Sequence, residues 1–423
     1  MHILHLNTVL SVSSCRYYAV NYAIIIGMKA RYSYRIYPTQ GQQTELSKLF
    51  GCCRVVWNDS LAWVLQTDAD TAWPSNAELQ KLCITLAKRY PQRAWLSEVA
   101  VTPLQQSVQD LGVAFKNFFE GHAKLPRFKR RDDKQSARFT QRGFSLKRGK
   151  LFLSKIGLVK VKWSRKLPAE PSSVTVIKNA AGQYYASFVV EMQQRSIEPL
   201  RERIGLDLGI KTFCFPSIGE PIAAPNYLKL NRQIARASRK LARQQKGSNR
   251  WQRTKQRLAK LHLSVRNIRK DFLHKLSTKL IRENQSVSIE DLNVSGMVRN
   301  RRLARAISQQ GWREFRTLLE SKASRYVDRQ VNVISRWEPT SQVCSSCGYQ
   351  WGKLDLSVRT VKCVSCGATH DRDQNAAKNI EKSGLDIAHG SKRTMNSCKS
   401  GMSSSEIASS SQPYEAKQLT LCF

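Results

Sequence analysis

Three carboxylates, Asp207, Glu290 and Asp373, lie in three separate short motifs, so far apart in the chain that only a folded domain can bring them together. Magnesium at a site that cleaves nucleic acid is held by a few carboxylates together with phosphate oxygens and water. Two such ions about 3.5–4 Å apart clamp the attacking and the leaving oxygen of an in-line displacement. Two strands and a helix that each deliver one acid are a sufficient ligand set, so the combination indicates a metal-dependent nuclease.

The first acid stands in the apolar stretch Ile204–Ile210. A strand period of two places the isoleucines and leucines on one face and Gly205, Asp207 and Gly209 on the other. With glycines on both sides of the carboxylate, we expect a cation and a phosphate backbone to approach it closely. The alternative is an ordinary aspartate at a strand end.

The other two acids have similar local settings. Glu290 ends the apolar part of Val287–Leu292, a second short strand, where Val287 and Ile289 face the core. Asp373 opens a helix, because Asp373, Ala376, Ala377 and Ile380 follow the spacing i, i+3, i+4, i+7. Taken singly, Glu290 could open a turn and Asp373 could be a helix N-cap.

Composition indicates a polyanionic partner. The 423 residues include 70 Lys and Arg against 31 Asp and Glu, a formal net charge of +39 with a pI near 10.2. Phosphate neutralisation with counterion release scales with the number of cationic contacts, so nucleic acid is the expected partner. An anionic membrane is the competing partner, but the sequence has no run of about 18 apolar residues. The apolar and charged contents, 41% and 24%, are those of a globular chain.

The N-terminal half combines strands with a helical block. An alternating pattern predicts a strand at 28–37, and helical spacing follows from Gly41 to about residue 121. Short strands are then predicted between 151 and 190. A small β-barrel interrupted by a helical insertion fits both blocks. Between them, the basic segment 124–134 contains Phe128 and is either a solvated loop or a site that tracks a single-stranded backbone.

The most basic segment lies between the first two acids. Residues 226–284 contain 18 Lys and Arg but only two acids, Asp271 and Glu283. Apolar residues from Leu258 to Leu280 recur every three or four positions, which predicts a long amphipathic helix with a cationic face. A charged helix face is usually only solvated. The scarcity of acids favours a phosphate-tracking surface instead.

Four cysteines form the most specific single motif. Cys344 and Cys347 make one CxxC knuckle, and Cys363 and Cys366 make a second one after 15 residues. Four thiolates close a tetrahedral zinc shell with no position left for water, so the metal is expected to be structural. Disulfides are the alternative, and they are disfavoured because the sequence is basic, has a cytosolic character and shows no secretory signal. His370, just after the second knuckle, is either a surface histidine or a residue that positions the third acidic motif.

The two ends differ in character from the rest. Residues 1–27 have a single basic residue, Arg16, and no signal-peptide pattern, so we expect an upstream extension or a weakly structured arm, with Met28 as the natural start. From Ser383 the periodicity is lost and serines accumulate between Ser391 and Ser411. This predicts a disordered tail.

These motifs, in this order, resemble the TnpB (OrfB) proteins of bacterial insertion sequences, relatives of the type V CRISPR effectors. The likeness runs from about Met28 to Leu385 and includes the acidic motifs and the four-cysteine ribbon. The remaining motifs that carry it are Tyr34-Arg-Ile-Tyr-Pro-Thr and Phe50-Gly-Cys-Cys-Arg-Val-Val-Trp-Asn58.

The resemblance implies an α+β multidomain fold: a wedge β-barrel with a helical recognition insert, then an RNase H-like (RuvC) α/β nuclease domain with an inserted zinc ribbon. The implied parts are the barrel at 28–50 and 124–200, the insert at 51–123, the nuclease domain at 201–340 and 367–385, the ribbon at 341–366 and the disordered tail at 386–423.

The resemblance also implies an activity: cleavage of matching double-stranded DNA with a guide RNA made from the end of the mobile element. Carried over by position, the catalytic, magnesium-binding acids are Asp207, Glu290 and Asp373, while structural zinc binds the four cysteines. Asp371 is set aside, because the family's catalytic aspartate stands two residues before the asparagine, here Asn375. The implied location is the bacterial cytoplasm, on the nucleoid.

Two other functions compete with this one. A non-catalytic regulator of transposition could use the basic surface and the ribbon to bind DNA or RNA, but it has no need of three isolated carboxylates. A transposase that itself joins strands in DNA recombination would carry a catalytic tyrosine motif or a DDE domain, and the sequence shows neither.

Overall fold

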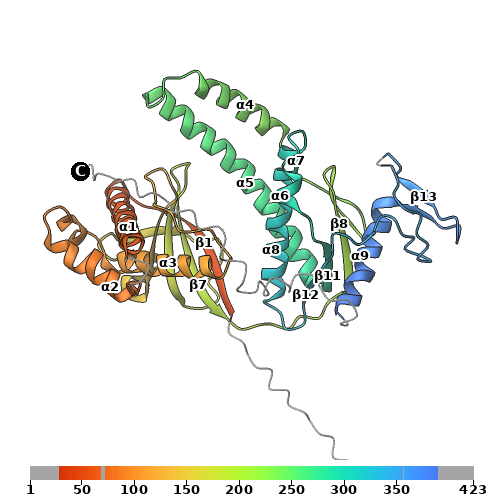
Figure 1. The fold of residues 1–423 in the computed structure, drawn as a ribbon, viewed down its shortest axis with the longest axis horizontal. Coiled ribbons are helices and arrows are strands. Elements are labelled where there is room, and N and C mark those ends of the chain that lie inside the picture. The colour runs from red at the N-terminus through yellow and green to blue at the C-terminus, as the bar shows by residue number, and fades with distance from the viewer. Residues whose placement is uncertain (1–27, 68–71, 356, 389–423) are drawn as a thin grey trace, which may run out of the picture.

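The computed structural model describes residues 28–67, 72–355 and 357–388, which form two lobes (Figure 1). The expectations for residues 1–27 and for the serine-rich tail fall outside these ranges. Within them, no helix combines the length and the apolar character needed to cross a membrane. The fold is mixed α and β, as predicted.

The first lobe is built on a barrel-like sheet of seven strands in the order β2-β6-β7-β1-β5-β4-β3. Strand β1 (Met28–Tyr37) lies in its middle and pairs antiparallel with β5 (Gly157–Lys162) and β7 (Tyr184–Met192). The other four strands are β2 (Gln135–Thr140), β3 (Phe144–Lys147), β4 (Lys150–Leu153) and β6 (Pro171–Lys178).

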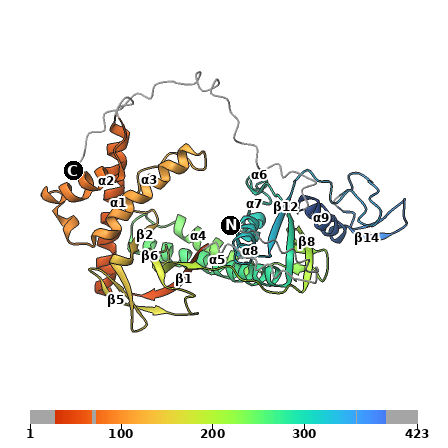
Figure 2. The ribbon, with the colours of Figure 1, turned by 90° about the horizontal axis from the view of Figure 1, so that it is seen from below.

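The α-helices between β1 and β2 are α1 (Gln40–Gln66), α2 (Asn76–Gln80) and α3 (Val101–Phe119), of which α1 and α3 contact β2 of the sheet. A capping box begins α1, because the side chains and backbone amides of Thr39 and Gln42 bond reciprocally. Apolar residues of α1, α3 and the sheet share one core. Figure 2 shows these helices at the end of the molecule farthest from α9.

The second lobe contains a five-stranded sheet in the order β10-β9-β8-β11-β12. Strands β8 (Arg201–Leu208), β11 (Asn284–Glu290) and β12 (Gln330–Ile334) are parallel to one another. Strands β9 (Thr212–Pro216) and β10 (Ile222–Ala223) extend the sheet antiparallel on the other side.

Helices cover both faces of this sheet. On one face, α5 (Asn249–Glu283) and α8 (Trp312–Ala323) bury apolar residues against β8 and β11. The opposite face is covered by α9 (Arg372–Ala388), which contacts β8, β11 and β12. The short helices α6 (Val294–Met297) and α7 (Ala304–Gln310) connect β11 to α8.

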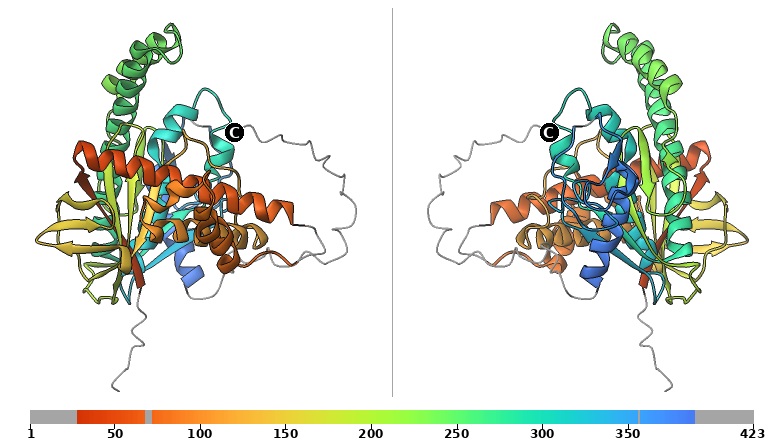
Figure 3. Two further views of the ribbon diagram at one scale, coloured as in Figure 1. Left: turned by 90° about the vertical axis from the view of Figure 1, so that its left-hand side faces the viewer. Right: turned by 90° about the vertical axis from the view of Figure 1, so that its right-hand side faces the viewer.

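The long helix predicted from Leu258 to Leu280 is confirmed as part of α5, and the basic segment 226–284 also contains a second helix. Helix α4 (Leu228–Ala242) packs antiparallel on the start of α5, and Ser248 caps α5 by accepting the backbone N–H of Trp251 at 3.2 Å. The hairpin projects from the body of the molecule (Figures 1 and 3). The predicted apolar stripe of α5 is buried at Leu276 and Leu280, whereas Ile268 remains 41% exposed.

A small hairpin of β13 (Thr360–Lys362) and β14 (Thr369–Asp371) leads directly into α9. The predicted loss of order from residue 383, and the tail assigned from 386, begin too early, because α9 continues to Ala388. Apolar periodicity fails there for a local reason. A Cβ at Gly384 would lie 2.0 Å from Ser288 Oγ, so only a glycine allows the helix to pack on β11.

Candidate active site and metal centre

Asp207 and Glu290 lie on neighbouring parallel strands. In the pairing of β8 with β11, Leu206 is opposite Ile289, so the next residues along each strand, Asp207 and Glu290, are neighbours across the pair. Leu206 and Ile289 are buried in the core. Because side chains alternate along a strand, both carboxylates belong to the opposite face, the one that α9 covers.

Asp373 stands at the start of α9, and a different acid caps this helix. Asp371 Oδ1 accepts the backbone N–H groups of Asp373 and Gln374, both at 3.0 Å. Asp371 therefore fills the capping role that was the alternative for Asp373. The carboxylate of Asp373 remains available for other contacts.

Asp373 forms an ion pair with a residue that its sequence motif does not indicate. Arg359 Nη1 lies 3.2 Å from Asp373 Oδ2 and 3.5 Å from Oδ1. The backbone of Arg359 is anchored as well, because its C=O accepts the N–H of Arg372 at 2.7 Å. The signal that could have identified Arg359 is its place four residues before Cys363, in a hairpin that must return to the start of α9.

Gly205 does not leave space for a cation or a phosphate to approach Asp207, although such space was expected from the sequence. A Cβ there would lie 2.1 Å from the backbone O of Ala377 and 2.6 Å from the backbone N of Glu381. The space beside the strand is therefore filled by α9, and it is not open to a cation or a phosphate. Gly209 is likewise fixed by its own turn, since its Cβ would lie 2.8 Å from the backbone O of Thr212.

The charges of Glu290 and Asp373 both act on Asp207. Burial raises the pKa of Asp207 to about 7, and the charges of Glu290 and Asp373 contribute to this rise. Burial also raises the pKa of Glu290 to about 7, with a contribution from Asp291. Acids that resist ionisation in this way are stabilised in their charged form by a cation, as a metal site requires. The three carboxylates nevertheless do not converge as closely as the cysteine cluster described below.

Asp291, next to Glu290, is held away from the shared face. Its Oδ1 accepts a hydrogen bond from Arg316 Nη1 at 2.8 Å, and its Oδ2 pairs with Arg336 Nη2. Two guanidinium groups therefore surround one carboxylate. Arg316 also pairs with Glu320 at 2.8 Å, so two arginines and two carboxylates form one charge-balanced network beside the end of β11.

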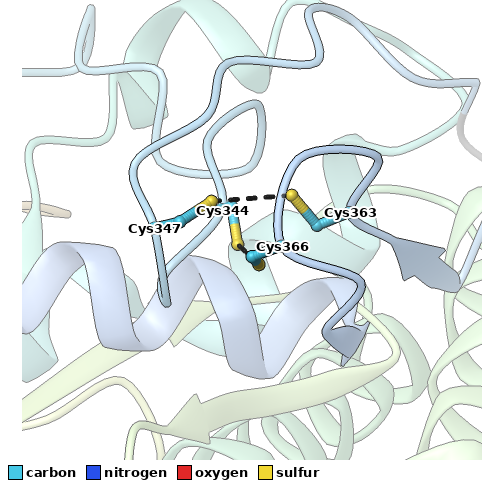
Figure 4. A group of neighbouring side chains, drawn as sticks. All are labelled: Cys344, Cys347, Cys363 and Cys366. Carbon is cyan, nitrogen blue, oxygen red and sulfur yellow. Dashed lines mark hydrogen bonds between the residues drawn. The ribbon is translucent and has the colours of Figure 1, made fainter.

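The four cysteines come together as expected. All four sulfurs lie within 4.8 Å of one another, the one such group of potential metal ligands in the described ranges (Figure 4). The Sγ–Sγ distance is 3.8 Å for Cys344 and Cys366 and 3.6 Å for Cys347 and Cys363. A tetrahedron with metal–sulfur bonds of about 2.3 Å has sulfur–sulfur edges of about 3.8 Å. The cluster fits a four-coordinate metal closed to water.

Buried side chains join the cysteine cluster to α9. Asn375 Oδ1 accepts the N–H of Ser345 at 2.8 Å, and Asn375 Nδ2 donates to Val343 O at 2.7 Å. Asn379 Nδ2 also donates to Val343 O at 2.7 Å. His370 is buried with its Nε2 3.2 Å from Cys344 Sγ, so its interpretation as a surface histidine was wrong. The cluster and the helix that carries Asp373 are therefore one unit.

The basic segment 124–134 is not simply a solvated loop, since it is bonded to α1. Trp57 Nε1 donates to Arg127 O at 3.1 Å, while Asn58 bonds both backbone groups of Lys129 at 2.8 and 3.0 Å. Lys129 Nζ lies 3.5 Å from the centre of the Trp57 ring. A cavity of about 360 Å³ beside these residues is lined by Arg54, Arg127, Lys129, Arg130 and Lys134 among others.

Three family descriptions match the chain. Residues 187–301 match "Probable transposase" (OrfB_IS605), residues 28–64 match its helix-turn-helix domain, and residues 312–380 match the TNB domain of Cas12f1-like proteins. A relative from Streptomyces pristinaespiralis, named "Putative RNA-guided DNA endonuclease", is 41% identical over 368 residues, which cover 85% of this chain and 90% of the relative. InsQ of Escherichia coli K12, with the same description, is 32% identical over 374 residues, which cover 84% of this chain and 92% of InsQ.

A solved structure has a similar fold. The Cas12f1 chain in a complex with single guide RNA and target DNA aligns with a TM-score of 0.52 at 12% identity, covering 84% of this chain and 98% of that one. At this identity the likeness concerns the fold alone. It extends over both lobes.

Proposed function

This chain belongs to the OrfB (TnpB) family, and from that premise we propose that it is an RNA-guided, magnesium-dependent endonuclease that cleaves double-stranded DNA. The relatives that carry this description align over more than four fifths of the chain. Guide RNA from the end of the mobile element and a matching DNA duplex are the proposed partners. The proposed place of action is the bacterial nucleoid.

One observation carries the proposal: the β8–β11 register makes Asp207 and Glu290 neighbours on the face that α9 covers. The charge of Asp373, at the start of α9, reaches Asp207 and raises its pKa. Two strands and a helix that each contribute one acid to this face support the proposed ligand set. A protein that only binds nucleic acid gains nothing from acids placed beside a polyanion.

In the proposed reaction, a water oxygen forms a bond to phosphorus while the bond between phosphorus and one sugar oxygen breaks. The water loses a proton to solvent, and the departing oxygen takes one up. Magnesium bound by Asp207, Glu290 and Asp373 would supply charge stabilisation at the phosphate. Asp291 is kept out of this ligand set by its pairing with arginines.

We further propose that the cysteine cluster holds structural zinc. Four sulfurs within 4.8 Å of one another, two of whose separations match tetrahedral edges, would leave no open position for a reactive ligand. The proposed parts of the chain are a wedge barrel at 28–50 and 124–200, a recognition insert at 51–123, a RuvC-like nuclease domain at 201–340 and 367–385, and a zinc ribbon at 341–366.

The test is cleavage directed by RNA. The purified protein is combined with RNA transcribed from the flank of its own gene and with duplex DNA that matches the 3′ segment of that RNA. We expect cutting of the matched duplex, and replacement of the segment should redirect the cut. Cutting that survives RNase treatment throughout purification, or that ignores the replaced segment, would contradict guidance by RNA.

Substitutions test the proposed acids. Asp207→Ala, Glu290→Ala and Asp373→Ala should each abolish cleavage while leaving binding of nucleic acid almost unchanged, because each removes one metal ligand from a surface that stays cationic. Asp371→Ala is the matched control. It removes the cap of α9 and should cost about 0.5–2 kcal/mol of stability with a milder effect on cleavage. Full activity in any of the three variants would overturn the assignment.

A further inference from the structure

Trp337 is unusually exposed. Among the described residues, Trp337 and Val364 are the most exposed large hydrophobic side chains, each at 81%. A single exposed apolar residue needs no explanation by its exposure alone. The position of Trp337 and the charges beside it give it a role.

Trp337 follows the strand next to Glu290. Strand β12 is parallel to β11, and its last residue, Ile334, pairs with Glu290. Three further residues span at most about 10 Å, and paired strands lie about 4.8 Å apart. The backbone of Trp337 is therefore within roughly 15 Å of Glu290, past the same edge of the sheet.

A turn fixes the backbone at this position. The backbone N–H of Trp337 donates to Ser335 Oγ at 3.3 Å, and the backbone N–H of Glu338 donates to the backbone O of Ser335 at 3.1 Å. The preceding residue, Arg336, is tied to Asp291. The indole is thus presented on an anchored turn.

The charges beside Trp337 fit a phosphate backbone. Two guanidinium groups lie beside this turn: Arg336 and Arg316 both pair with Asp291, and Arg316 also pairs with Glu320 at 2.8 Å. Sites for single-stranded nucleic acid combine such cations with aromatic rings on which bases stack. An exposed indole and two arginines beside the acids provide both elements.

We propose that Trp337 is a stacking platform for an unpaired base of the DNA strand that is being cut. This inference rests on the proposed function, since guide pairing would release an unpaired strand. Stacking on a base and pairing of phosphates with Arg336 or Arg316 would fix the scissile phosphate near the acids. A stacked base inside a duplex has no free face for the indole, so the platform is specific to single strands.

Single-turnover cleavage by the full chain with its RNA tests the proposal. Trp337→Ala should slow cleavage about 10- to 100-fold, the range expected when one base loses its aromatic partner, with binding of the matched duplex changed less than about 3-fold. Trp337→Phe keeps a π-face and should retain most of the rate, whereas Trp337→Leu keeps only apolar bulk and should resemble the alanine variant. Val327→Ala, at a 61% exposed apolar residue between α8 and β12, is the control and should be neutral.

A binding measurement separates this inference from the guided activity. Single-stranded DNA that contains 2-aminopurine is titrated with the protein without RNA. Stacking should quench the fluorescence with wild type and Trp337→Phe, but not with Trp337→Ala. Equal quenching by wild type and the alanine variant, or a leucine variant as active as phenylalanine, would overturn the platform. If wild type quenches but never cuts with RNA, the proposed function fails and the platform stands.

Discussion

Gly205 marks a close approach of α9 to the sheet. A Cβ at this position would overlap the backbone of Ala377 and Glu381, and backbone atoms of a packed helix cannot move independently. The residue beside a catalytic candidate therefore has a packing role. It sets the distance between the strand that carries Asp207 and the helix that carries Asp373.

We predict that Gly205→Ala destabilises the fold by at least about 1–3 kcal/mol and also slows cleavage, because α9 must move away from β8. Thermal melting and cleavage rates measure the two effects. Gly41→Ala is the control, since a Cβ at this position in α1 has no atom within 4 Å and alanine favours a helix. A variant at Gly205 with wild-type stability would show that the helix adapts.

The pKa values of Asp207 and Glu290 give a second prediction at this scale. Burial and the neighbouring acids raise both to about 7, so the folded protein holds more protons at these residues than the unfolded chain between about pH 4 and 7. Stability must then fall as the pH rises through that window. This loss of folding stability is absent below about pH 4 and complete above about pH 7.

Melting temperatures at pH 5 and pH 8, without added magnesium, measure this loss in wild type and in Asp207→Asn. The variant should lose less stability between the two pH values, because an amide does not titrate, and the comparison removes effects of the remaining charges. Millimolar magnesium should restore stability at pH 8 in wild type and not in the variant. Identical pH dependence in both proteins would contradict the shifted acid.

At the scale of elements, the sequence predicted helices and strands whose apolar residues recur at a regular spacing. The strands β1, β4 to β8 and β11 were expected, whereas β2, β3, β9 and β12 were not. In β2, only Ala137 and Phe139 are buried apolar residues, which gives a weak pattern. The end of α9 was placed too early because its contact with the sheet depends on Gly384, and a glycine carries no apolar signal.

The candidate site was predictable only in part for a similar reason. Acids in apolar strands and cysteines in knuckles carry their signal within a few residues. Which strands are neighbours, and that Arg359 reaches Asp373, depends on register and on the return path of a hairpin. Such long-range pairings leave no local trace in one sequence.

The ribbon gives a prediction about coupled elements. Asn375 and Asn379 tie Val343 and Ser345, beside the first knuckle, to α9. We expect Cys347→Ser to lose zinc and stability together, since metal binding is linked to folding, and to lose cleavage although every acid is intact. Elemental analysis, melting and cleavage measure the three effects.

Val364→Ser is the control for the ribbon. Val364 lies within the second knuckle, is 81% exposed and offers no ligand, so zinc content, stability and cleavage should stay at wild-type values. Wild-type cleavage by a zinc-free Cys347→Ser protein would show that the knuckles and α9 are independent.

On the scale of the whole molecule, positive charge extends well beyond the candidate site. The net charge is +39, and the α4–α5 hairpin, which projects from the body of the molecule (Figure 3), carries many of the cations. A footprint limited to a cleavage site does not require this surface. A long phosphate backbone held along the hairpin does require this cationic surface. The counterions released on binding would make the affinity strongly dependent on salt.

We predict that the protein without RNA binds DNA of any sequence, with affinity that falls about 10³- to 10⁵-fold between 50 and 200 mM salt if 6–10 phosphates are neutralised. Replacing Arg257, Lys260 and Arg266, three exposed cations of α5, with alanine should reduce the slope of log Kd against log salt by about one for each phosphate that loses its cation. Lys275→Ala is the control, because its charge is already paired with Asp271 at 2.7 Å. An unchanged slope in the triple variant would place the backbone elsewhere, and the hairpin would then be a solvated projection.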